Sequence, residues 1–243
     1  MCGIFGAFKT SNERRLNPKI IMAGAIKAQA SGLDSAGICF HKRGKAPILI
    51  KQPDSMGRLI LEHYDRIYNL IGSCDVVLAH TRFATTGAVT YFNAQPFMRE
   101  PYVFLHNGHI SGLGNKNISD SNELSFILQR NGVDALKEHI NTRWGFANLV
   151  IYDYKKNTLL LSPEQVGSRI IIQATRGVNY FASVPNWLPF NKSTKLVDTF
   201  SYKVGTQDVQ KLANYRDTVK AWRRYITTTA TKTKGSVKWQ NIK

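Results

Sequence analysis

Apolar side chains recur along the chain with two spacings, and these spacings separate predicted helices from predicted strands. Where apolar residues return every three or four positions, we expect helices with one buried face. Asn17-Pro18 marks the start of the first helix, because asparagine can cap a helix and proline suits its first position. The predicted helices span residues 17–32, 54–70 and 120–132.

Short runs rich in β-branched and aromatic residues predict strands between and after these helices. Helices grouped among strands, followed by a strand-rich second half, indicate a mixed α and β fold rather than a regular strand–helix–strand repeat. The predicted strands span residues 4–8, 37–41, 48–51, 76–80, 102–106, 147–152, 158–161, 170–174, 179–182 and 199–204.

Length and composition predict one compact domain with an appendage. The chain has 243 residues, of which 43% are hydrophobic, and this is enough for a substantial core. No run approaches the ~18 uninterrupted apolar residues of a membrane span, and the N-terminus lacks the features of a secretory signal peptide. We therefore expect no membrane association.

The three cysteines, Cys2, Cys39 and Cys74, are odd in number and widely spaced. This spacing suggests neither disulfides nor a zinc site. Cys39 and Cys74 stand among apolar residues, as buried small hydrophobic residues do. The chain also lacks a phosphate-binding loop and a nicotinamide-binding fingerprint. We expect a cytoplasmic protein with neither metal nor cofactor.

The net charge of +17 is concentrated toward the end of the chain. From Phe190 onward there are twelve Lys or Arg against three Asp. Residues 216–225 interleave basic and aromatic side chains, a pattern that can bind nucleic-acid phosphates and stack on bases. The same residues suit an amphipathic helix that docks on an acidic partner or on its own domain. Residues 227–234 are polar and low in complexity.

The chain opens with Met1-Cys2. Removal of Met1 would leave Cys2 with a nucleophilic thiol and a free α-amino group on the same Cα. Such an amine titrates at roughly 7.7–8.0, so part of it is neutral at cytoplasmic pH and can take the thiol proton. An isolated cysteine at this position is more often an incidental small hydrophobic residue. Its interpretation therefore depends on the rest of the chain.

Segments at four places resemble, in order and at plausible spacing, the glutaminase domain of class II glutamine amidotransferases, a branch of the N-terminal-nucleophile hydrolases. The opening Cys-Gly-Ile-Phe-Gly is similar to that family's first motif. The resemblance covers roughly residues 2–205, so we predict a glutaminase domain over 1–205 and a basic, partly helical extension over 206–243. The other matching segments are residues 32–37 (GLDSAG), 80–87 with 93–97 (HTRFATTG and NAQPF), and 105–108 with 119–121 (LHNG and SDS).

The resemblance implies an α+β fold, a four-layer αββα sandwich in which two stacked antiparallel sheets lie between helical layers. It also implies that Cys2 attacks the side-chain carboxamide of L-glutamine, giving a γ-glutamyl thioester and ammonia before water releases glutamate. The Asn107 side-chain amide and the Gly108 backbone N–H would stabilise the oxyanion. Losing one such donor typically costs roughly 2.7–4 kcal/mol.

Recognition of free glutamine requires groups for a carboxylate and for an ammonium. Arg82 carries a planar fork that can bind both carboxylate oxygens, and Thr85 can add a hydroxyl donor. Asp120 suits the ammonium, and by resemblance the Gly108 region helps there. Asp120 is also typical of a helix N-cap, with Ser119 beside it. Both interpretations of Asp120 stay open.

The sequence departs from the family pattern around these residues. Phe83 replaces a tryptophan, and Thr86 stands where many members have histidine. Gln95 or Phe97 stands where they have the histidines of Asn-Ala-His-Pro-His. These departures bear on the affinity for glutamine and on closure of a loop over it. Residues 87–92, with Gly87 as a hinge and two aromatics, suit such a lid, and they equally suit an ordinary connection between strands.

About forty residues lie beyond the resemblance, too few for a second catalytic domain. We therefore expect the ammonia to pass to an acceptor bound by a separate synthase subunit, or the protein simply to hydrolyse glutamine. The alternative is a catalytically silent family member that binds a partner or nucleic acid through the basic tail. Cys2, Asn107 and Gly108 argue against that alternative, because a scaffold needs none of them.

Overall fold

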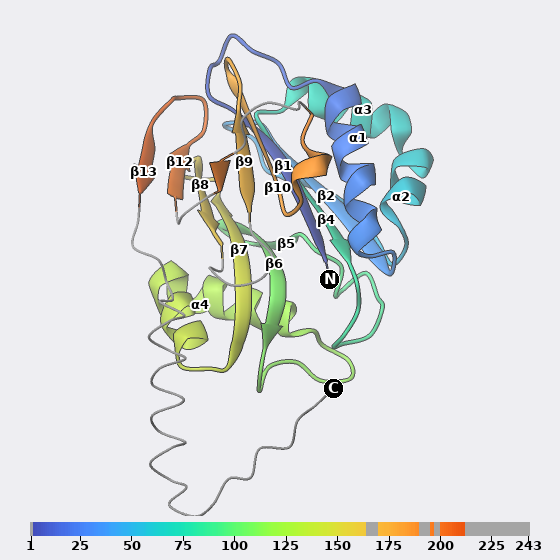
Figure 1. The fold of residues 1–243 in the computed structure, drawn as a ribbon, viewed down its shortest axis with the longest axis vertical. Coiled ribbons are helices and arrows are strands. Elements are labelled where there is room, and N and C mark those ends of the chain that lie inside the picture. Colours follow the sequence, from blue (N-terminus) through green and yellow to red (C-terminus); the bar gives the residue numbers. More distant parts are fainter. Residues whose placement is uncertain (1, 164–169, 190–194, 197–199, 212–243) are drawn as a thin grey trace, which may run out of the picture.

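The computed structural model describes residues 2–163, 170–189, 195–196 and 200–211, and within them two antiparallel sheets lie face to face (Figure 1). In strand order, the first sheet contains β11 (Lys195–Leu196), β9 (Ile171–Ala174), β10 (Val178–Ala182), β1 (Gly3–Lys9), β4 (Val76–Arg82), β2 (Ser35–His41) and β3 (Ile48–Gln52). The second contains β13 (Val209–Lys211), β12 (Phe200–Lys203), β8 (Thr158–Ser162), β7 (Gly145–Asp153), β6 (Tyr102–Ile110) and β5 (Phe97–Arg99).

Helices cover the outer face of each sheet. Three helices pack on the first sheet, and α4 packs on the second (Figure 1). The predicted four-layer αββα sandwich is therefore confirmed. The helices are α1 (Pro18–Ala28), α2 (Met56–Glu62), α3 (Tyr64–Ser73) and α4 (Asp120–Asn141), with short 3-10 turns at Gln29–Ser31 and Pro185–Trp187.

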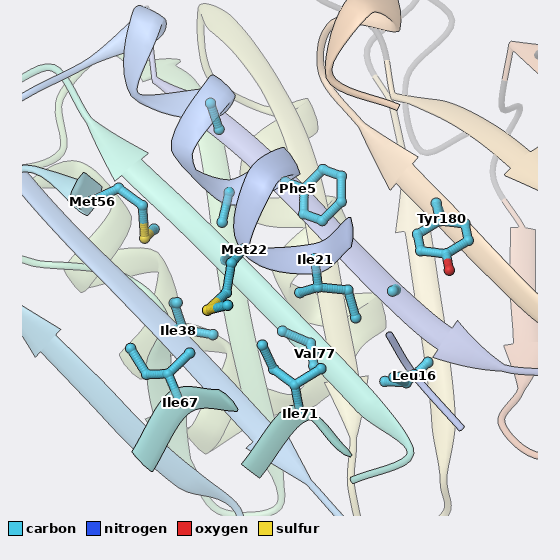
Figure 2. Close-up of a cluster of buried hydrophobic side chains, with 14 of the residues drawn as sticks. Phe5, Leu16, Ile21, Met22, Ile38, Met56, Ile67, Ile71, Val77 and Tyr180 are labelled. Carbon is cyan, nitrogen blue, oxygen red and sulfur yellow. The ribbon is translucent and has the colours of Figure 1, made fainter. Parts of the chain in front are cut away.

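The alternation of side chains along each strand divides the core into three layers. In β1, Phe5 and Ala7 face the helices, whereas Ile4 and Phe8 face the second sheet. Figure 2 shows the first of these layers, in which Phe5 lies with residues of α1, α3 and β4. A third layer lies between the second sheet and α4. Because β1 is buried on both faces, its register within the first sheet is strongly specified.

One helix prediction was wrong. The helix predicted over residues 54–70 is two helices, because His63 has φ −124° and ψ 25° and interrupts the helical path. The helix predicted to end near Gly132 does break there, because Gly132 is non-helical, with φ 80° and ψ −177°, and a second helical part follows it. The second part is stabilised by Leu136 and Ile140, which are buried against the second sheet.

The remaining elements largely match the prediction. Asn17 caps α1, and its side chain accepts hydrogen bonds from two backbone N–H groups of the first turn. Each predicted strand is present, with ends shifted by a few residues. Sequence periodicity missed β5, β11 and β13, which have only two or three residues each and are too short to show a pattern. Cys39 and Cys74 are buried free thiols, as expected.

The predicted boundary at residue 205 falls in a turn between two paired strands, because β13 pairs with β12. The basic and aromatic residues 216–225 and the polar residues 227–234 lie outside the described residues. In the part that is described, the helices are all too short or too polar to cross a membrane.

We predict that Phe8→Ala will lower the free energy of unfolding by about 3–5 kcal/mol, because it empties a fully buried site between the sheets. The Phe8 ring lies 5.1 Å from that of Tyr202 and 6.4 Å from that of Phe181. Urea unfolding measures the change. Leu61→Ala, at a position that is 78% exposed, is the control and should change it by less than about 0.5 kcal/mol. Equal effects of the two substitutions would contradict this account of the core.

Candidate active site

The layer between the two sheets is apolar over most of its length and becomes polar at one end. On β4, the apolar residues Val76 and Leu78 are followed on the same face by His80. On β6, Val103 and Leu105 are followed in the same way by Asn107. The same alternation on β1 places Cys2 beyond Ile4. Strands from both sheets therefore direct polar side chains toward one place.

Cys2 immediately precedes β1 and lies partly buried between the ends of β4 and β6. Its Sγ is 3.4 Å from the backbone N of Phe83, which donates to it, and 3.6 Å from the carbonyl oxygen of the same residue. Its own carbonyl oxygen accepts a hydrogen bond of 2.8 Å from Nδ2 of Asn107. Cys2 therefore contacts both the segment after β4 and the side chain of Asn107 on β6.

Burial raises the pKa of the Cys2 thiol, although the Phe83 N–H and the charge of Arg82 act in the opposite direction. The thiolate is the nucleophilic form of cysteine. A thiol with a raised pKa is mostly protonated near neutral pH, so reaction here requires a base that removes its proton during attack.

His80 and Asn107 form a buried hydrogen bond between the two sheets. His80 Nε2 lies 3.0 Å from Asn107 Oδ1. Because Oδ1 can only accept, the hydrogen belongs to Nε2. This bond turns the amide so that its NH₂ group faces Cys2. Complete burial lowers the pKa of His80 to about 3, so the imidazole is neutral at physiological pH. The sequence motifs did not indicate a separate role for His80.

Gly108 follows Asn107 at a position that requires glycine. Its φ of +157° is one that side-chain-bearing residues rarely adopt. A Cβ there would overlap the carbonyl oxygen of Phe146 and crowd Nε2 of His106. The backbone can adopt this conformation between Phe146 and His106 only because no side chain is present.

Arg82 is 4% exposed at the end of β4, and its guanidinium holds the loop that follows. It donates hydrogen bonds to the carbonyl oxygens of Thr86, Gly87 and Ala88, at 2.5, 2.9 and 3.1 Å. The GLDSAG segment also contacts the start of this loop. There, Asp34 accepts a hydrogen bond from the backbone of Ala84, 2.6 Å away.

The loop over residues 87–92 exposes about half of the side chains of Val89, Tyr91 and Phe92. Its far end is fixed by Asn93, which donates to the carbonyl oxygens of Ala88 and Asn117. These contacts describe one position of the loop, and its movement as a lid stays a prediction. Thr85 is exposed on the same segment, and its side chain makes no hydrogen bond within the part of the chain that the structure describes.

Asp120 is the first residue of α4, and its neighbour Ser119 is the N-cap. The N-cap interpretation of Asp120 is therefore wrong. The Ser119 hydroxyl accepts from the backbone of Asn122 at 3.2 Å. The Asp120 carboxylate accepts from the backbone N–H groups of Ser121 at 2.7 Å and Ile110 at 3.2 Å. It is 6% exposed and close enough to Cys2 and Arg82 to influence the pKa of each.

The structure thus brings together five of the six predicted site residues, namely Cys2, Arg82, Asn107, Gly108 and Asp120. In the described residues, no group of three or more His, Cys, Asp or Glu side chains is arranged to hold a metal ion. A thiol, an amide donor, a buried guanidinium and a carboxylate can together bind and attack a small zwitterion that carries a carbonyl group.

Comparisons with known proteins identify relatives by sequence and by fold. A model of the family described as class-II glutamine amidotransferases matches residues 11–124. The isomerizing glutamine–fructose-6-phosphate aminotransferase of Aquifex aeolicus is 26% identical over 235 residues, covering 88% of this chain and 38% of that protein. The chain therefore spans well under half the length of this relative.

Two solved structures share the fold. The glutamine phosphoribosylpyrophosphate amidotransferase from B. subtilis superposes with a TM-score of 0.66 at 17% identity, covering 87% of this chain and 49% of that one. A glutamine aminotransferase class-II domain protein from Silicibacter pomeroyi gives a TM-score of 0.55 at 12% identity, covering 86% of this chain and 99% of that one. At these identities the likeness establishes the four-layer fold.

We predict that His80 stays neutral in the folded protein throughout pH 5–8. Its pKa of about 3 lies below the ordinary value of 6.5, because burial disfavours the charged ring. Its contribution to stability is therefore complete above pH 6.5 and is lost as the pH falls toward 3. NMR titration of the His80 ring measures this directly. A midpoint between pH 6 and 7 would show that the ring is not buried as described.

Proposed function

This chain carries a class II glutamine amidotransferase domain, and from that premise we propose that it hydrolyses the carboxamide of L-glutamine to glutamate and ammonia through Cys2. The observation that carries the proposal is the hydrogen bond of 2.8 Å from Asn107 Nδ2 to the carbonyl oxygen of Cys2, with Arg82 and Asp120 close by. These residues supply the nucleophile, an oxyanion donor and partners for both charges of a free amino acid.

Removal of Met1 would give Cys2 its own α-amino group as a base. That amine has a pKa of roughly 7.7–8.0 and is partly neutral near pH 7.5. Since burial keeps the thiol protonated, the amine takes its proton as sulfur attacks the carboxamide carbon. The proton then passes to the departing ammonia, and water hydrolyses the γ-glutamyl thioester. An N-terminal cysteine thereby combines nucleophile and base in one residue.

The oxyanion formed during attack would be stabilised from β6. Asn107 Nδ2 carries two hydrogens, of which the bond to the Cys2 carbonyl uses one, so the second remains for the oxyanion. Backbone groups alternate in direction along a strand. Because the N–H of Ile110 points to Asp120, away from β7, that of Gly108 is directed to the same edge. Such fixed donors require no reorganisation during the reaction.

Arg82 and Asp120 would hold the α-carboxylate and the α-ammonium of glutamine. Arg82 already donates to three loop carbonyls, so the carboxylate must take over part of these bonds. Substrate binding and the position of residues 86–88 are thereby linked. Thr85, which is exposed immediately before these residues, adds a hydroxyl donor to the carboxylate when the loop closes. The Asp120 carboxylate is fixed by two backbone N–H groups and keeps capacity for the ammonium.

The ammonia would be used by an acceptor bound to a separate subunit or to a region beyond this domain. Relatives such as the aminotransferase of Aquifex aeolicus are longer than this chain, and their names identify an acceptor sugar phosphate. A cytoplasmic setting is part of the proposal, because Cys2 must remain a free thiol to act as a nucleophile.

We expect that a diazo-ketone analogue of glutamine will add once to the wild-type protein, in which Met1 is absent, and will not add to Cys2→Ser. Cys74→Ser is the matched control and should keep the adduct, because burial raises the pKa of the Cys74 thiol to about 12 and leaves it unreactive. Intact-protein mass spectrometry measures both events. Retained Met1, or an adduct that persists in Cys2→Ser, would refute the proposed mechanism.

Asp120→Asn should raise the KM for glutamine roughly 10- to 100-fold with a smaller effect on kcat. A hydrogen bond to a charged group contributes about 1.5–3 kcal/mol, and the neutral amide keeps the shape but loses the charge. Steady-state glutaminase assays measure the change. Asp134→Asn, an exposed substitution on the same helix, should leave both constants unchanged. An unaltered KM in Asp120→Asn would remove Asp120 from the binding site.

A further inference from the structure

Gln95 makes a pair of hydrogen bonds that the proposed chemistry does not use. Its Oε1 accepts from the backbone N–H of His106 at 2.7 Å, and its Nε2 donates to the carbonyl oxygen of the same residue at 3.0 Å. Gln95 is 2% exposed and His106 is 1% exposed. One side chain therefore satisfies both backbone groups of a buried residue that directly precedes Asn107.

The strand register explains why this side chain is needed. β5 pairs with β6 at Phe97 opposite Phe104. Two residues further along, the same register would place the backbone of Gln95 opposite that of His106. β5 begins only at Phe97, so the main chain of Gln95 does not extend the strand pairing to His106. The carboxamide of Gln95, which has the donor and acceptor of a peptide group, continues the pairing in place of the backbone.

His106 transmits this restraint to the site in two ways. Its ring Nδ1 lies 2.9 Å from the hydroxyl of Ser121, which adjoins Asp120 at the start of α4. Its Nε2 lies where a Cβ at Gly108 would crowd it, so the ring packs directly against Gly108. A displacement of His106 would therefore move the Gly108 backbone and the adjoining Asn107.

The edge of β6 that faces away from β7 is thus held on both sides of Gly108. Gln95 binds the backbone of His106 on one side, and Asp120 accepts from the N–H of Ile110 on the other. Between these two restraints, the alternation of the strand directs the Gly108 N–H to the same edge. A donor fixed in this way needs both flanking residues to keep their places.

We propose that Gln95 is a positioning residue that aligns the Asn107 amide and the Gly108 N–H with the oxyanion. It acts through the backbone of His106 and does not touch the substrate. This inference rests on the proposed function, because these donors matter only if Cys2 attacks a carboxamide. A misplacement of about 1 Å in such a site can cost on the order of 100-fold in rate.

Gln95→Glu tests the requirement for a donor at Nε2. Burial opposite the His106 carbonyl raises the pKa of the new carboxyl group, and only its protonated form can donate to that carbonyl. At pH 8 we expect kcat to be at least about tenfold below wild type, by the same positioning argument. The ratio of the variant's kcat to that of wild type should rise as the pH falls from 8 to 6, while the KM for glutamine changes less.

Gln95→Leu should have a low kcat whose ratio to that of wild type does not vary with pH, because leucine neither donates nor titrates. Gln29→Glu is the matched control. Gln29 only accepts a hydrogen bond, from the backbone of Gly57 at 3.0 Å, which a carboxylate also accepts. The activity of the Gln29→Glu variant should follow the wild-type pH profile. Thermal unfolding of each variant identifies any loss of activity that arises from unfolding.

The outcomes separate this inference from the proposed function. If wild type hydrolyses glutamine and both Gln95 variants are folded with wild-type kcat, the positioning role is refuted and the glutaminase proposal stands. If wild type does not hydrolyse glutamine, the proposed function fails. In that case amide hydrogen exchange decides the structural claim. Faster exchange at His106 and Gly108 in Gln95→Leu supports it, and unchanged exchange overturns it.

Discussion

The hydrogen-bonded chain from His80 through Asn107 to the backbone of Cys2 is the constraint on which the site depends. Its members come from β4, β6 and the residue that precedes β1, and its central bond of 3.0 Å joins the two sheets where their apolar contact ends. Here the neutral imidazole orients an amide, and the amide in turn positions the main chain that carries the thiol.

The order of apolar and polar residues along the strands determines where these hydrogen bonds form. Alternate residues of β1, β4 and β6 fill the space between the sheets, and toward the site they give way to His80 on β4, Asn107 on β6 and Cys2 just before β1. The apolar part fixes the register, because a slip of one residue would turn each buried side chain to the opposite face. The same packing that stabilises the fold therefore sets the distance between Cys2 and Asn107. The packing of these strands therefore also fixes the geometry of the site.

A second set of contacts connects the loops to this frame. Arg82 holds the carbonyl groups of residues 86–88, Asn93 fixes the other end of that loop, and Gln95 continues the sheet beside His106. Each of these side chains is buried and bonded to backbone rather than to another charge. Side chain to backbone bonds of this kind give irregular segments a defined position without secondary structure. The loop that carries Thr85 is therefore anchored at both ends.

The sequence by itself determined the element types, the layered fold and five residues that meet at the site. Periodicity identifies strands such as β1 and β4, and the spaced motifs single out Cys2 and Asn107, because both signals are local. It failed at His63, which divides one predicted helix into two, and it did not predict the helical part that follows Gly132. It also gave no role to His80 and Gln95. Only the tertiary structure showed the contacts of these two residues, because each binds a residue of another strand. The strand register that brings the partners together is fixed by packing between elements distant in sequence.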